Sequence, residues 1–158
     1  MSKLTDYATM VLAELARVEG GILKSADVAA RTGLTPTTVS KLLKSLTRAE
    51  LVNSHRGAHG GYVLARPPAE ISAAEVIVAL EGPVAITECS TVEGNCDLEA
   101  VCRVGGAWQR INLAIYRALQ DISLAELIGG ANTTLSYVDL RSVTTRSGGA
   151  PDISTRSR

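Results

Sequence analysis

The stretch "SADVAARTGLTPTTVSKLLKSLTR" limits more than any other what this chain can fold into. It contains two helical patterns separated by a turn of a few residues. Ser25 is placed to cap a helix over residues 26–31, and Gly33 stands where that helix would end. Thr35 is placed to cap a second helix with Pro36 at its first position, where the missing N–H costs nothing. This order predicts a helix-turn-helix.

The second helix has two unlike sides. Its apolar residues share one face and leave hydroxyls and lysines on the others. In a helix-turn-helix the second helix lies in the major groove, with its N-terminal residues at the base edges. The residues predicted to reach bases or phosphates are Thr37, Thr38, Ser40 and Lys41, and Lys44 supplies charge for the backbone.

The flanking segments extend the pair to a winged helix-turn-helix. "LTDYATMVLAELARVEGG" spaces its apolar residues as a first helix that a glycine pair ends. "LVNSHRGAHGGYVLARPP" has two short runs, 51–55 and 62–65, around a glycine-rich loop, which predicts a β-hairpin wing. An arginine at the hairpin tip, Arg56, suits the narrow minor groove, and His59 follows it. The fold class predicted is therefore mainly α with a small two-stranded hairpin.

The distribution of charge agrees with a nucleic-acid partner. Residues 1–66 carry nine Lys and Arg against five Asp and Glu, whereas residues 67–130 carry three against nine. A basic front half favours contact with a polyanion such as double-stranded DNA. A three-helix unit with a hairpin also occurs in protein-interaction domains, and that alternative stays open.

The cysteines suggest a second activity, because Cys89, Cys96 and Cys102 lie close together with six and then five residues between them. Structural zinc sites usually contain pairs separated by two to four residues, and an odd cysteine count argues against a disulfide framework. Wider spacings suit an iron–sulfur cluster, in which each iron takes a separate thiolate. Three thiolates leave a four-ligand cluster one ligand short, to be supplied by His, a carboxylate, a small molecule or water. Incidental thiols fit poorly with so acidic a loop.

Two further helices are predicted around the cysteines. Ser72 with Glu75 three residues later forms a capping-box pattern before "AAEVIVALEG". From Ala107 onward one long amphipathic helix is expected, with an apolar stripe made of Trp108, Ile111, Ile115, Leu119 and Ile122. A second copy of the chain or its own domain covers that stripe, and pattern alone does not decide between them.

These patterns divide the chain into four parts. We predict a DNA-binding domain over 1–66, a connecting helix and cluster loop over 67–106, a dimerisation helix over 107–130, and a mostly disordered tail over 131–158. No run of 18 apolar residues occurs, and Asp6 and Glu14 interrupt the N-terminus where a signal peptide needs an apolar run. We therefore expect a cytoplasmic protein without a membrane partner. No arrangement of a nucleophile with an acid–base pair indicates an enzyme.

Taken together, the motifs resemble the iron–sulfur cluster regulator family whose branches are IscR, NsrR and RirA. The likeness rests on "LTDYA", "TVSKLLKSL", "RGAHGGYVLARP", "ALEGP" and three cysteines followed by "AWQRIN". Within the family the chain is most similar to regulators of the SUF system. The resemblance implies a homodimeric winged-helix repressor of cluster-assembly genes, with a 2Fe–2S or 4Fe–4S cluster as cofactor.

The chain departs from IscR-like members at one position. They carry a histidine three residues after the last cysteine, where this sequence has Gly105. Asp6 matches the aspartate that NsrR-type members supply from the partner subunit, so the resemblance implies Asp6 as fourth ligand, ahead of Asp97 and Glu88. The competing hypothesis is a metal- or redox-binding interaction module, for instance loaded with zinc, that recognises no specific DNA.

Overall fold

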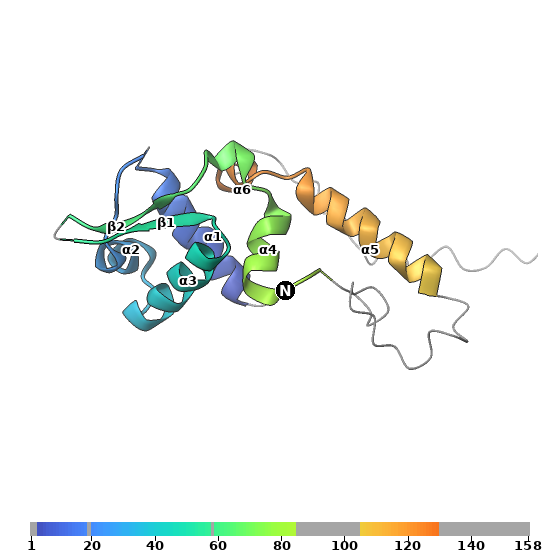
Figure 1. Ribbon diagram of the computed structural model, residues 1–158, viewed down its shortest axis with the longest axis horizontal. Helices are drawn as coiled ribbons and strands as arrows, with labels where there is room; N and C mark the ends of the chain where they lie inside the picture. The colour runs from blue at the N-terminus through green and yellow to red at the C-terminus, as the bar shows by residue number, and fades with distance from the viewer. Residues whose placement is uncertain (1–2, 19, 58, 85–104, 130–158) are drawn as a thin grey trace, which may run out of the picture.

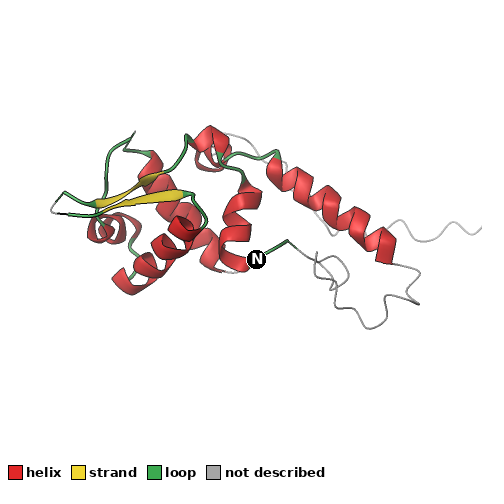
Figure 2. Cartoon of the chain, viewed as in Figure 1, coloured by secondary structure: helices red, strands yellow, loops and turns green. Residues whose placement is uncertain are grey.

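The computed structural model describes residues 3–18, 20–57, 59–84 and 105–129 (Figure 1). The three cysteines, Glu88, Asp97 and the predicted tail over 131–158 lie outside the described residues. The elements are α1 (Lys3–Ala16), α2 (Ser25–Thr32), α3 (Pro36–Arg48), β1 (Val52–His55), β2 (Gly61–Leu64), η1 (Pro68–Glu70), α4 (Ala73–Glu81), α5 (Gly105–Gln120) and α6 (Leu124–Gly129). A two-stranded hairpin lies beside the first three helices at one end of an otherwise helical molecule, which confirms the predicted fold class (Figure 2).

An aliphatic core holds the first three helices together. Leu12 of α1, Val28 of α2 and Leu43 of α3 are fully buried in one cluster. The chain has no phenylalanine, so this core is built from Leu, Val, Ile and Ala. Burial of one such side chain contributes about 1.5–3 kcal/mol. The apolar face predicted for the second helix of the pair is therefore the face on which α3 packs.

The two helix starts of the helix-turn-helix differ from each other. The cap predicted at Thr35 is confirmed, because its hydroxyl oxygen accepts the Thr38 N–H at 3.3 Å. Gly33 ends α2 at φ 70°, as predicted, with its N–H donating to a backbone carbonyl. The cap predicted at Ser25 is wrong: Ser25 is the first residue of α2, and Lys24 precedes it in extended conformation without a side-chain cap.

The reason for that difference is a backbone pairing that the sequence pattern did not predict. The strands pair antiparallel, with Val52 opposite Leu64. Leu23 adds a single bridge to the hairpin: its N–H donates to the Tyr62 carbonyl at 2.9 Å, and the Tyr62 N–H donates back at 2.8 Å. This pairing keeps the chain extended through Lys24. As a result α2 begins at Ser25, one residue before the start predicted from a cap at Ser25.

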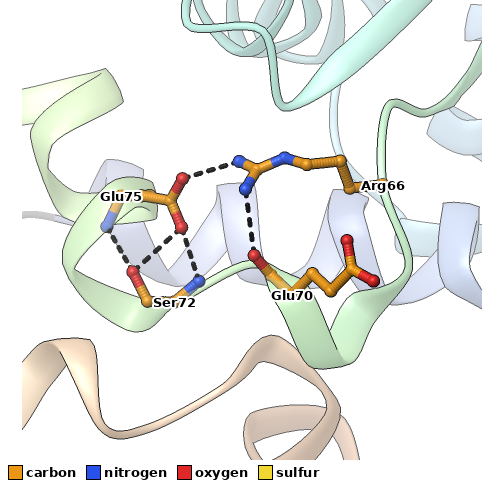
Figure 3. Close-up of polar contacts among 4 residues, drawn as sticks. All are labelled: Arg66, Glu70, Ser72 and Glu75. Atoms are coloured by element: carbon orange, nitrogen blue, oxygen red, sulfur yellow. Dashed lines mark hydrogen bonds and ion pairs between the residues drawn. The ribbon is translucent and has the colours of Figure 1, made fainter.

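α4 begins at a capping box, as predicted. The Ser72 N–H donates to Glu75 Oε2 at 2.8 Å, and the Glu75 N–H donates to Ser72 Oγ at 3.3 Å. Arg66 joins the same carboxylate through Nη2 at 2.6 Å and also donates to the Glu70 carbonyl at 3.0 Å (Figure 3). The end of the wing and the start of α4 are thus tied to one carboxylate.

The long helix predicted from Ala107 is two helices. α5 ends at Gln120, and Ser123 caps α6 because its hydroxyl accepts the Glu126 N–H at 3.2 Å while its own N–H donates to the Glu126 carboxylate at 2.7 Å. This second Ser-x-x-Glu pattern was visible in "SLAE" and was missed. α6 returns to the first helices, and Leu124 is fully buried in their core.

α5 itself is not covered. No residue of this helix is buried, and it extends away from the body formed by the other helices (Figure 1). Trp108, Ile111 and Ile115 are 38%, 44% and 37% exposed. Within the described part of the chain, no helix is both long and apolar enough to cross a membrane.

The carboxylate of Glu75 is expected to make stability depend on pH. Partial burial raises the pKa of Glu75, but hydrogen bonds from Ser72 and Arg66 together outweigh it, so that this pKa lies below its ordinary value of 4.5. The ionised form therefore stabilises the fold fully above pH 4.5, and this contribution is lost as pH falls through the lowered pKa.

Glu75→Gln is expected to lower the free energy of unfolding by about 1 kcal/mol at neutral pH, a value reduced by partial exposure. Below pH 4.5 the stability of the variant should also decrease less steeply with falling pH than that of the wild type. Urea unfolding followed by circular dichroism at several pH values measures both effects. Glu70→Gln is the matched control, because Glu70 contributes only its backbone carbonyl to this cluster. Equal stability of the two variants would contradict the stabilising role of the Glu75 carboxylate.

Candidate nucleic-acid interface

The outer face of α3 presents hydrogen-bond donors to solvent. Thr37, Ser40, Lys41 and Lys44 are exposed, and with Pro36 they line a shallow concavity of about 450 Å³. The opposite face of the helix is buried in the core. α3 contains no Asp or Glu, so nothing on the helix itself repels a phosphate or occupies its lysines. The face has the chemistry for base edges and a phosphate backbone.

Thr38 differs from the other residues predicted on this face. It is half-buried, and its hydroxyl lies 2.9 Å from the Thr35 hydroxyl within the cap of α3. Its backbone N–H is also used by that cap. The structure thus places Thr38 at the start of the helix with a role in forming it. A DNA contact from Thr38 stays a prediction.

The wing carries its predicted residues on a turn that requires glycine. Arg56 and His59 are both exposed between β1 and β2. Gly57 has φ 108°, which favours glycine, and a Cβ at Gly60 would lie 2.4 Å from the His55 carbonyl oxygen. A larger residue at position 60 would displace the turn on which Arg56 stands.

Ion pairs divide the basic residues into two sets. Arg17 and Arg31 lie 2.5 and 3.9 Å from the Glu14 carboxylate, and Arg66 pairs with Glu75. Lys41, Lys44 and Arg56 make no ion pair with any described residue. The hairpin tip and α2 lie at one end of the molecule and α5 extends from the other (Figure 1). The cations of α3 and the wing are therefore available to an external anion.

A separate apolar groove runs along α1 at the other side of the core. It has a volume of about 560 Å³ and is bounded by α1, α4 and the segment from Leu119 to Ile128. Met10, Ile122 and Leu127 in its wall are 43%, 40% and 43% exposed. Asp6 is exposed and lines the same groove, so it lies on a face of α1 that another molecule can reach.

The segments on either side of the cysteine loop are held by side chains. The Thr5 hydroxyl donates to the Glu81 carboxylate, which joins the start of α1 to the end of α4. Asn112 Nδ2 of α5 donates to the Val84 carbonyl at 2.9 Å. The described part of the chain contains no cluster of three or more potential metal ligands, and His55 and His59 are both exposed.

Comparisons with known proteins agree with the winged-helix geometry. The Rrf2 family model, described as an iron-dependent transcriptional regulator, matches residues 1–130. The transcriptional regulator IscR of Sodalis glossinidius is 32% identical over 141 residues, which cover 89% of this chain and 84% of that protein.

Two solved structures are similar in fold. CymR, the global cysteine regulator of B. subtilis, superposes with a TM-score of 0.63 at 29% identity, covering 84% of this chain and 98% of CymR. IscR of T. potens superposes with a TM-score of 0.59 at 27% identity, covering 83% of this chain and 87% of that one.

Lys41→Ala and Arg56→Ala are expected to weaken binding to a duplex that the protein selects from a random library. The loss should be about tenfold or more for each, because good base contacts contribute about 1–3 kcal/mol. Fluorescence anisotropy measures it, and Lys3→Ala, an exposed lysine at the start of α1, is the control. Both side chains are exposed, so an unchanged thermal midpoint is expected too. Binding as tight as that of the control would exclude α3 and the wing as the interface.

Proposed function

The chain belongs to the Rrf2 family of transcriptional regulators, and on this basis we propose that it is a repressor of cluster-assembly genes governed by an iron–sulfur cluster. DNA-binding regulation is a property of the family and needs no enzyme chemistry. The cluster, the repressor role and the target genes are the proposed part. The observation that carries the proposal is the match to an iron-dependent family model over 1–130, a range that includes all three cysteines.

The available donors fit an iron–sulfur cluster. Cys89, Cys96 and Cys102 supply three thiolates from one loop, and thiolates are the usual ligands of such clusters. When bound, the cluster supplies a centre that responds to oxidation or to loss of iron. The exposed carboxylate of Asp6 is our candidate for the fourth ligand, and an oxygen ligand on iron exchanges more readily than a thiolate.

A second copy of the chain would bring Asp6 to the loop. α5 carries Trp108, Ile111 and Ile115 without cover, whereas the groove along α1 is apolar and open. In a twofold-symmetric dimer each α5 would lie in the groove of the other copy. If the N-terminal half of that α5 lies beside Asp6 of the other copy, Asp6 comes near the cysteines, because α5 begins three residues after Cys102.

Family membership favours this proposal over an interaction module without DNA recognition. The relatives differ in their regulatory roles, since CymR is a global cysteine regulator. The wide cysteine spacing is the feature that favours a cluster over a zinc-loaded module in this chain. Metal content of the purified protein distinguishes the two.

Protein purified without oxygen is expected to contain iron and sulfide in equal amounts and to absorb visible light. Cys96→Ala should lose both, because one cluster ligand is removed, and Ser90→Ala in the same loop should keep both. Asp6→Ala should retain the cluster but lose it faster in air. Lys41→Ala should leave metal content unchanged. Zinc in place of iron, or unchanged absorption in Cys96→Ala, would contradict the proposal.

Ile111→Asp is expected to shift the protein from dimer to monomer, because it places a charge in the exposed apolar stripe of α5. Sedimentation velocity measures the shift, which we expect to exceed tenfold in the dissociation constant, about 1.4 kcal/mol. Arg110→Ala, an exposed change on the same helix, is the control. Monomeric wild-type protein, or equal dissociation constants for the two variants, would refute the dimer helix.

A further inference from the structure

Lys24 lies outside both elements expected to contact DNA, yet the fold attaches it to one of them. It is exposed at the start of α2, and the two hydrogen bonds between Leu23 and Tyr62, at 2.9 and 2.8 Å, fix the adjacent residue to strand β2. Lys24 therefore directly follows a residue that is bridged to the wing. Periodicity gave no sign of this, because the pairing joins segments about forty residues apart.

The approach of the two segments is as close as backbone atoms permit. A Cβ at Gly61 would lie 2.5 Å from the Leu23 carbonyl oxygen. Only glycine fits at this point, so the contact and the two hydrogen bonds hold the segment before α2 against the wing. When the wing is placed on a duplex, the backbone of Lys24 is placed with it.

The charge of Lys24 is also unused within the described residues. The ion pairs among the described residues involve Arg17, Arg31 and Arg66, and none involves Lys24. The nearest carboxylate on the same helix is Asp27, which is exposed and forms no ion pair with Lys24. Lys24 thus belongs, with Lys41, Lys44 and Arg56, among the cations that no described carboxylate neutralises.

We propose that Lys24 contacts a DNA phosphate beside the wing, and so sets affinity without reading sequence. The inference rests on the DNA-binding part of the proposed function and not on the cluster. A lysine is a compact charge suited to phosphate, and one such contact adds about 0.9 to the slope of log affinity against log salt. A dimer with two such residues would gain about 1.8.

Lys24→Gln tests this with two duplexes of equal length, one selected by the protein from a random library and one of unrelated sequence. Binding to both is expected to weaken by the same factor, about three- to tenfold, with the salt slope reduced by about 0.9 for each bound subunit. Lys24→Arg should keep the slope. Lys3→Gln, an equally exposed change at the start of α1, should leave affinity and slope unchanged.

Three results would overturn the assignment. Affinity and slope of Lys24→Gln equal to those of Lys3→Gln would remove Lys24 from the interface while leaving the DNA-binding proposal intact. Weaker binding to the selected duplex alone would make Lys24 a reader of bases. Wild-type protein that enriches no sequence from the library and does not bind the unrelated duplex would refute the DNA-binding proposal together with this inference. Circular dichroism confirms that the variants are folded.

Discussion

The pairing of residues 71–73 with residues 122–124 determines how the rest of the chain is arranged. The Ala73 N–H donates to the Ile122 carbonyl at 2.8 Å, and the Leu124 N–H donates to the Ile71 carbonyl at 2.7 Å. Ile71 and Leu124 are both fully buried in the core of the first three helices. The starts of α4 and α6 are therefore held side by side on the core, to which α4 also contributes the buried Val76.

The features that the sequence predicted well are helix caps, which depend only on residues close together in the chain. Gly33, Thr35 and the Ser72–Glu75 pair act on neighbouring residues, so their caps follow from spacing alone. The start of α2 and the break after α5 depend on partners far along the chain, Tyr62 in one case and Ile71 in the other. Long-range pairings of this kind override local preference, which is why Ser25 does not cap and one helix became two.

The same distinction applies to the candidate interface. Exposure of Thr37, Ser40 and Lys41 follows from a helix with one apolar face, so periodicity was enough to find them. Thr38 shares that spacing, yet its hydroxyl lies against Thr35, a contact that only the folded cap reveals. Lys24 could be identified as a candidate only from the pairing of Leu23 with the hairpin. The cysteines and their predicted ligand set rest on sequence and resemblance, since they lie outside the described residues.

The glycines of the wing have a consequence for tolerance to mutation. Side chains at positions 60 and 61 would collide with backbone oxygens, which cannot move aside as a flexible side chain can. Gly60 lies at the tip of the hairpin, outside the buried core, whereas Gly61 faces the backbone of Leu23, a residue of that core. Substitution at position 60 should therefore leave the helices packed while displacing the turn that carries Arg56, whereas substitution at position 61 should also disturb the segment before α2.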